Sequence, residues 1–231
     1  QLCADLEGAH GVAAPRAAAA RQFVRAMCAR LPPPESSELR RHAFELVASA
    51  GDGGGAALGS GAVAGVVLLP GVLPAMAGDD SSGLCARALP AVCRCASEAA
   101  GAGRPALGAL ALEALEALVE ACPGAEVEAL LQTIRDMFGR FLQAGGGSGG
   151  GGEAPAPHAA RAAVQCWAAA TATLLRRGGF APQAAAFLEA LLVALERNVE
   201  VMEFVPVAFQ LLTPPQFDAG SPAKAKLPPL A

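Results

Sequence analysis

Cysteine is the residue type in this sequence that could most readily bind a metal or act as a nucleophile. Cys93 and Cys95 are separated by one residue and could form half of a metal site. No second cysteine or histidine pair lies at zinc-finger spacing, so we predict no metal site. The number of cysteines is odd and most fall in apolar helical segments, which predicts free thiols in a reducing compartment. The seven are Cys3, Cys28, Cys85, Cys93, Cys95, Cys122 and Cys166.

Three glutamates at helical spacing, Glu113, Glu116 and Glu120, form a second group that could bind a metal. Carboxylates in this pattern bind metals inside helical bundles only when facing helices supply matching ligands. The histidines lie far away in the sequence: His10, His42 and His158. A solvated acidic helix face is therefore the simpler interpretation.

The glycine-rich segment Gly51–Gly61 contains GxGxxG-like spacings that could suggest phosphate binding. No strand is predicted before it, and a phosphate-binding loop needs a strand, a turn and a helix in that order. The sequence also lacks a G-K-[ST] motif and any nucleophile–His–Asp arrangement. We therefore predict a protein that is not an enzyme and that binds no cofactor of its own.

The elements that position these residues are predicted to be helices. Hydrophobic residues make up 53% of the chain, but many of them are alanine, and aromatic residues make up only 4%. Alanine has the highest helix propensity, whereas the aromatic and β-branched residues that favour strands are scarce. Glycine and proline gather between the periodic segments. The sequence therefore predicts an all-α fold.

Charge argues against nucleic acid as a partner and short apolar length argues against membrane insertion. The formal net charge is -4 and no basic stripe is present. Residues 53–78 carry no charge, but Pro70 and Pro74 interrupt them. The dense apolar core Val63–Leu69 is also far shorter than the ~20 residues that span a bilayer.

Apolar periodicity predicts a row of amphipathic helices separated by short turns. Ser36, Ser37 and Glu38 supply capping residues for the second helix, and the stretch Phe180–Leu212 predicts two helices joined by a three-residue polar turn. The other predicted helices cover Pro15–Arg30, Val63–Leu69, Leu84–Ala100, Leu107–Cys122, Val127–Leu142 and His158–Arg177.

Because the predicted turns between helices are short, successive helices should be antiparallel. Each helix pair must then bury its apolar face against the next pair. The pairs recur at ~40 residues, the period of HEAT and armadillo arrays. We predict an α–α superhelix, a HEAT/armadillo-like solenoid of antiparallel helix pairs, over residues 1–213. Residues 51–61 and 145–157 are predicted as flexible glycine-rich loops, and residues 214–231 as a disordered or extended tail.

The first predicted helix carries an apolar face and a basic face. Its apolar face is formed by Phe23, Val24, Met27 and Leu31, and its arginines project elsewhere: Arg16, Arg21, Arg25 and Arg30. A solvated basic face is one interpretation of the arginines, and the recruitment of an acidic partner is the other.

Two blocks of the sequence match the pattern of a known protein family. The first block, Ala4–Leu31, has a DLEG segment at Asp5–Gly8 followed by an arginine-rich helix. The second, Val127–Leu212, ends with the family's pattern F-x-E-A-L…E-F-x-P-x-x-F-Q. This pattern is matched here by Phe187, Glu189-Ala190-Leu191, Glu203-Phe204, Pro206 and Phe209-Gln210. On these residues the sequence resembles the importin-β (karyopherin) family, in particular the export receptors that return importin-α to the cytoplasm. The resemblance covers a middle portion of a longer family chain and is poor between Gly51 and Gly101.

This resemblance implies a carrier that wraps a helical surface around Ran-GTP and importin-α, with the GTP held by Ran. It also admits contacts with nuclear pore proteins and implies shuttling between nucleus and cytoplasm. It makes Asp5 and Glu7 candidates for the edge that contacts Ran. Together with the arginines of the basic helix face, Arg16, Arg21 and Arg25, they are the predicted partner-binding residues. A HEAT-repeat scaffold that binds a different protein partner, without catalysis, is the alternative.

Overall fold

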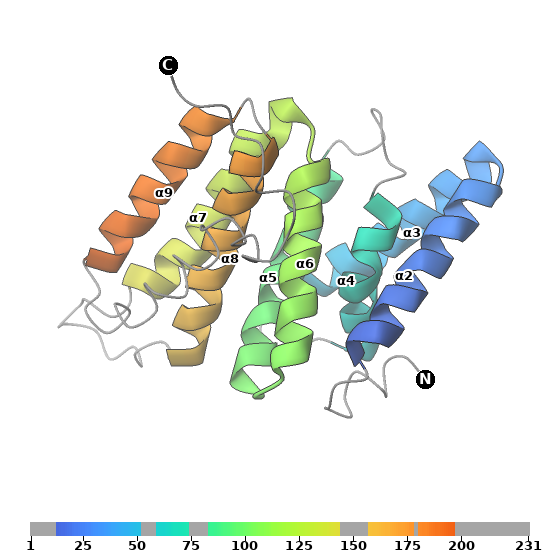
Figure 1. The fold of residues 1–231 in the computed structure, drawn as a ribbon, viewed down its shortest axis with the longest axis horizontal. Coiled ribbons are helices and arrows are strands. Elements are labelled where there is room, and N and C mark those ends of the chain that lie inside the picture. Colours follow the sequence, from blue (N-terminus) through green and yellow to red (C-terminus); the bar gives the residue numbers. More distant parts are fainter. Residues whose placement is uncertain (1–12, 52–58, 74–82, 144–156, 178–179, 197–231) are drawn as a thin grey trace, which may run out of the picture.

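The structure is a computed structural model that describes residues 13–51, 59–73, 83–143, 157–177 and 180–196. Within these ranges the chain forms eight α-helices and one short 3₁₀ helix, and no strand. The prediction of an all-α fold is therefore confirmed. The helices follow one another across the molecule from α2 at one side to α9 at the other (Figure 1).

Most helices begin and end close to the predicted positions. Their bounds are α2 Ala13–Arg30, α3 Pro33–Gly51, α4 Ser60–Val72, α5 Leu84–Gly101, α6 Pro105–Ala121, η3 Gly124–Glu126, α7 Val127–Gln143, α8 Pro157–Arg177 and α9 Ala181–Glu196. Several boundaries differ from the predictions. Helices α3 and α8 include Gly51 and Pro157, which were predicted as loop. Helix α3 begins three residues before Ser36, because Pro33 and Pro34 suit a first helical turn. Helix α4 already includes Ser60 and Gly61, which were predicted as loop.

The helices form two parallel rows. Helices α2, α4, α6 and α8 pack successively against one another in the even row, and α3, α5, α7 and α9 do the same in the odd row. The chain therefore alternates between the rows, and each row buries the inner face of the other. The even helices begin at residues 13, 60, 105 and 157, so one pair recurs every 45 to 52 residues. This is a repeat-like α–α array, as the sequence predicts.

The helices within the array do not pair equally. Helices α5 and α6 form the most extensive contact, and α5 also packs against α8. By contrast, α7 lies mainly against α8, α5 and α9 rather than against α6. The short connection Pro123–Glu126 thus carries the chain from one row to the other without producing a tightly packed hairpin.

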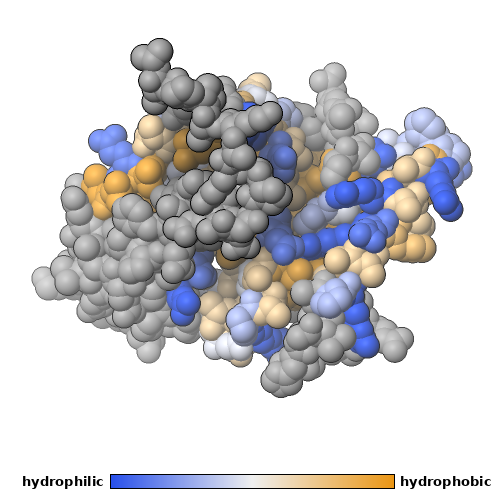
Figure 2. Space-filling view, in the orientation of Figure 1, coloured by the Kyte–Doolittle hydropathy of each residue, from blue (hydrophilic) through white to orange (hydrophobic). Residues whose placement is uncertain are grey.

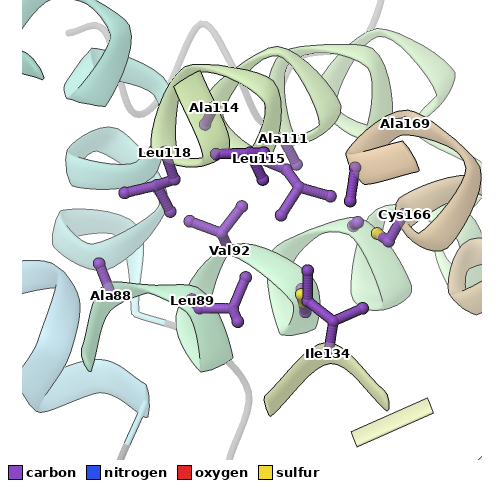
Figure 3. Packing of buried hydrophobic residues seen from close by; sticks show 14 of the residues in the cluster. Ala88, Leu89, Val92, Ala111, Ala114, Leu115, Leu118, Ile134, Cys166 and Ala169 are labelled. Atoms are coloured by element: carbon purple, nitrogen blue, oxygen red, sulfur yellow. The ribbon is translucent and has the colours of Figure 1, made fainter. Parts of the chain in front are cut away.

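Small and branched apolar side chains fill the space between the rows. Val92 of α5 points towards Leu115 and Leu118 of α6, and Leu89 of α5 and Ile134 of α7 belong to the same cluster on the other side of α5 (Figure 3). All five are essentially inaccessible to solvent. Burial of one such side chain contributes about 1.5–3 kcal/mol, so this central contact supplies much of the stability of the array.

Helices α8 and α9 join through the one tryptophan of the chain. Trp167 lies against Phe187 with the ring centroids 4.9 Å apart, and its indole N–H donates a 2.9 Å hydrogen bond to the carbonyl oxygen of Phe187. Both side chains are buried. The buried indole therefore has its partner, as buried polar groups require.

Several predictions fall on residues outside the described ranges. These are the DLEG segment, most of the two glycine-rich loops, the helix predicted over residues 199–212 and the tail 214–231. As a separate finding, none of the helices that the structure describes is long and apolar enough to cross a membrane.

Candidate partner-binding face

Helix α2 is rotated differently from the prediction. Phe23 is 65% exposed and Met27 is 37% exposed, although the sequence places both on the buried face. The buried positions of α2 are Ala17 and Cys28, and Arg21 lies beside them with only 13% of its side chain exposed. The prediction of a buried Phe23–Met27 face, with all four arginines directed to solvent, is therefore wrong.

The close approach of α2 to α4 explains this rotation. A methyl group placed on Gly71 of α4 would lie 2.7 Å from the carbonyl oxygen of Arg21, closer than a real side-chain carbon approaches. Two helices at this separation leave room between them for Ala17 but not for an aromatic ring. The small residues therefore occupy the contact, and Phe23 is left on the outer side.

Arg21 joins three helices of the even row. Its Nε donates a 2.6 Å hydrogen bond to the carbonyl oxygen of Val67 in α4, and a second nitrogen reaches the carbonyl oxygen of Leu110 in α6 at 3.5 Å. The same guanidinium forms an ion pair with Glu113 of α6. Because one rigid fork serves all three partners, Arg21 fixes the position of α2 on the row.

Arg25 donates a hydrogen bond to a carbonyl group at the end of α4. One of its terminal nitrogens donates a 3.2 Å hydrogen bond to the carbonyl oxygen of Pro70, which belongs to the last turn of that helix. The last carbonyl groups of a helix have no partner within the helix and favour a nearby cation. Arg25 therefore serves partly as a cap supplied by the neighbouring helix, while its side chain stays exposed.

Helix α8 makes similar arginine contacts to the end of α6. Arg177 donates a 2.6 Å hydrogen bond to the carbonyl oxygen of Val119 near the end of α6, and its guanidinium lies 4.6 Å from the centre of the Phe180 ring. Arg176 pairs with Glu116 at 3.0 Å. Arginine contacts to the ends and acidic side chains of a neighbouring helix are thus a repeated element of the even row.

The three glutamates of α6 do not form a uniform solvated face. Glu113 pairs with Arg21 of α2 and Glu116 pairs with Arg176 of α8, while Glu120 is exposed. Figure 2 shows hydrophilic residues gathered across the face that α6, α4 and α2 present. Sequence spacing could not reveal these pairs, because the partners lie 92 and 60 residues away along the chain.

The remaining outer side of α2 forms a distinct surface, which we call the outer stripe. It consists of Arg16, Phe23, Met27 and Arg30, all exposed. At 100° per residue these positions fall within a sector of about 60°, which lies about 130° around the helix from the sector of Ala17, Arg21 and Cys28. Two apolar side chains therefore stand between two arginines. The outer stripe is thus an exposed surface with an apolar centre.

The predicted partner-binding residues thus separate into groups. Arg21 is engaged within the molecule, Arg25 is shared between a cap and the surface, and Arg16 belongs to the outer stripe. Asp5 and Glu7 lie outside the described residues. Phe23 and Met27 are the surface residues that sequence reasoning assigned to the core, and an apolar pattern alone gives no signal of which side of a helix is covered.

The cysteines form two buried contacts. The thiols of Cys93 in α5 and Cys166 in α8 lie together, and this contact and burial raise the pKa of Cys93 well above its usual value. At the open end of the α5–α6 pair, a hydrogen bond with Cys122 lowers the pKa of Cys85 and raises that of Cys122. Burial raises the pKa of Cys95 to about 12. All six described cysteines are free and buried.

Within the ranges that the structure describes, no three side chains of His, Cys, Asp or Glu gather in a way that could hold a metal ion. The arrangement of arginines and glutamates serves packing and surface charge, and the buried thiols lie between helices.

Comparison with known proteins adds no family to this description. No protein-family model, no curated protein and no solved structure matches this chain.

Proposed function

We propose that this chain is a portion of a nuclear export receptor of the importin-β family, of the exportin-2 type, which carries importin-α out of the nucleus in complex with Ran-GTP. The observation that carries the proposal is the fold. A row of helix pairs presents a long continuous surface, and such arrays bind large protein partners along that surface. The residue blocks that resemble the family narrow the choice of partner.

The α9 part of the second block supports the proposal locally. Phe187 and Leu191 are buried against α8, while Glu189 is exposed. An F-x-E-A-L sequence with this division of positions suits a helix that packs on its neighbour and presents the acidic residue outward. The remaining residues of the pattern, Glu203 to Gln210, lie outside the described ranges.

Two arginines of α2 would contribute charge to a partner in this function. Arg16 and Arg25 are exposed, whereas Arg21 would hold α2 in place without meeting the partner. The nucleotide would be bound by Ran, so the chain itself needs no cofactor. Such a receptor shuttles between nucleus and cytoplasm, and contacts with nuclear pore proteins belong to the same proposal.

A pull-down with purified proteins tests the proposal. The full 231-residue chain is immobilised and incubated with importin-α and Ran, loaded either with a GTP analogue that is not hydrolysed or with GDP. The proposal expects importin-α to be retained with the GTP form and not with the GDP form, because cooperative binding of the two partners defines an export receptor. Equal retention with both forms, or retention of neither partner, overturns it.

The contribution of α2 is tested separately with charge reversals. We expect Arg16→Glu combined with Arg25→Glu to weaken assembly of the complex about tenfold, because an interfacial attraction becomes a repulsion. Arg161→Glu, at an exposed position on α8, is the matched control. Assembly unchanged by the α2 reversals removes these two arginines from the partner site while leaving the receptor proposal to the pull-down.

A HEAT-like scaffold for a different protein partner is the second candidate. The exposed Phe23 and Met27 favour it, because large apolar side chains on an outer helix face commonly mark a protein contact. Failure of the Ran and importin-α experiment, together with binding of another protein through α2, distinguishes this candidate from the first.

A further inference from the structure

Among the residues that the structure describes, two pairs of cysteines from different helices have their thiols in contact. Cys85, the second residue of α5, meets Cys122, which directly follows the end of α6. Cys93 meets Cys166 within α5 and α8. All four thiols are free and at most 2% exposed. The pairs therefore share their chemistry and their burial, but the first lies at helix ends and the second lies inside helices.

Charged groups from two further elements lie near the Cys85–Cys122 pair. Arg177 of α8 is hydrogen-bonded to a backbone carbonyl near the end of α6, and its charge acts on both thiols. Glu126 of η3 accepts a 2.9 Å hydrogen bond from the backbone N–H of Gly83, the residue before α5. The hydrogen bond with Cys122 and, to a smaller extent, Arg177 lower the pKa of Cys85 despite the opposing effects of burial and Glu126. The thiolate of Cys85 is therefore favoured.

The Cys93–Cys166 pair has the opposite character. The contact with Cys166, together with burial, raises the pKa of Cys93. Both side chains belong to the hydrophobic cluster between the rows, so exposing them requires separation of packed helices. Cys85 and Cys122 become accessible when one helical turn opens, which costs less free energy. Because the thiolate is the form that attacks a disulfide, Cys85 should react faster than Cys93.

We propose that Cys85 and Cys122 form an oxidisable dithiol, which exchanges with a small-molecule disulfide such as glutathione disulfide and closes into a disulfide bond between α5 and α6. The sulfur of Cys85 attacks one sulfur of glutathione disulfide and expels one glutathione thiolate. The sulfur of Cys122 then loses its proton to solvent, attacks the sulfur of Cys85 and expels the second. Two cysteine thiols are oxidised, one glutathione disulfide is reduced, and the two protons end on the two glutathione thiols.

The disulfide would act as a lock on the α5–α6 contact. Thiols in contact can reach the S–S bond length of about 2.05 Å by side-chain rotation, and the bond would join positions 37 residues apart. A cross-link of this span restricts the unfolded chain, so oxidation should raise the Tm by about 5–10 °C. The lock involves neither α2 nor any predicted partner-binding residue, so this inference stands independently of the proposed receptor function.

The experiment equilibrates the full 231-residue chain in anaerobic buffers that contain different ratios of glutathione to glutathione disulfide. Free thiols are trapped with one alkylating reagent, oxidised thiols are reduced and labelled with another, and peptide mass spectrometry assigns both labels. Where half of Cys85 and Cys122 is oxidised, Cys93 and Cys166 should be oxidised to an extent at least about tenfold lower. Mapping without reduction should detect a cross-linked Cys85–Cys122 peptide. In denaturant this preference should vanish, because only the folded chain brings the pair together.

Variants separate the two exchange steps. Cys122→Ala should leave Cys85 in a mixed disulfide with glutathione, since the second step lacks its thiol. Cys85→Ala should leave Cys122 reduced, because burial and its hydrogen bond with Cys85 raise the pKa of the Cys122 thiol. Cys93→Ala, the matched control in the other pair, should not change the oxidation of Cys85 and Cys122. Circular dichroism and denaturant unfolding verify that each variant folds.

Several results would overturn the proposal. One is a chain whose Cys85 and Cys122 stay reduced in glutathione disulfide alone. Another is a disulfide that forms first between Cys93 and Cys166, or between two chains. A preference for Cys85 and Cys122 that persists in denaturant would show that the fold does not create the site. An oxidised chain with an unchanged Tm would show that the bond does not lock the two helices.

Discussion

The middle of the array and its α2 end are built from similar alanine-rich helices, but different contacts hold them. In the middle, α5 has neighbours on several sides, and leucine, valine, alanine and cysteine side chains fill the space between them. In α2 the buried residues are Ala17 and Cys28, and the hydrogen bonds to the neighbouring helix α4 come from Arg21 and Arg25.

This difference follows from the number of neighbours available. A helix with neighbours on several sides, such as α5, can bury apolar residues on most of its circumference, so non-directional packing suffices to hold it. The described neighbours of α2 are α3, α4 and α6, and directional arginine contacts to α4 and α6 fix its rotation. The larger apolar residues then remain outside, where another molecule can cover them. Four variants test this contrast between the middle and the end.

The largest loss of stability is expected from Trp167→Ala between α8 and α9. The change leaves a cavity beside Phe187 and removes the hydrogen bond to its carbonyl group, so the free energy of unfolding should fall by about 3–5 kcal/mol. Denaturant unfolding measures this change. Trp167→Phe keeps the ring contact and should lose less than half as much. A loss below 1 kcal/mol for the alanine variant would contradict the packing of α9 on α8.

Gly71→Ala tests the close approach at the α2 end. The added methyl group meets backbone atoms of Arg21, which cannot rotate away, so α2 must shift at a cost of about 1–3 kcal/mol. Gly61 is the matched control in the same helix, because nothing lies within 4 Å of the position of its added methyl. Gly61→Ala should be neutral or stabilising by up to about 1 kcal/mol. Equal unfolding curves for the two variants would show that α2 and α4 are not in contact at Gly71.

Arg21→Met tests whether directional contacts hold the end helix. Methionine keeps much of the apolar stem but loses all the polar contacts to α4 and α6, so we expect about 2 kcal/mol lower stability. Arg30→Met, at an exposed position of the outer stripe, should change stability by less than about 0.5 kcal/mol, because surface substitutions usually have small effects. Similar losses in both variants would remove the distinction between inner and outer arginines.

A smaller, pH-dependent effect is expected from Cys95 in the middle of the array. Its folded-state pKa is about 12 against an ordinary value of 9.0, so above pH 9 the unfolded chain binds fewer protons than the folded chain. Stability therefore falls as pH rises from 9 towards 12, and by pH 10 the loss from Cys95 is about 1.4 kcal/mol.

Unfolding of the natural chain and of Cys95→Ala at pH 7 and pH 10 measures this loss. The stability difference between the two proteins should shrink by about 1.4 kcal/mol at the higher pH, because the variant lacks the titrating group. The other raised thiols, Cys93 and Cys122, act in both proteins and cancel. A difference that is the same at both pH values would place Cys95 in contact with water.

The function implied by the resemblance to nuclear export receptors stays a prediction, which the pull-down with Ran and importin-α tests. Its most specific residues, Asp5 to Gly8 and Glu203 to Gln210, lie outside the described ranges. The candidate site was predictable only in part from the sequence. The arginines of α2 are visible in the sequence, but the sequence assigns Phe23 and Met27 to the wrong side and Arg21 to solvent.

The sequence by itself determined the helices and their order, because apolar spacing, alanine content and the proline and glycine breaks are local properties. It also determined that the helices must stack, since each has a face that it cannot hide alone. Only the tertiary structure decided which side of each helix is covered. Gly71 brings α2 so near α4 that alanine fits between them and phenylalanine does not. Arg21 and Glu113 meet across 92 residues of chain, a contact that no local pattern encodes.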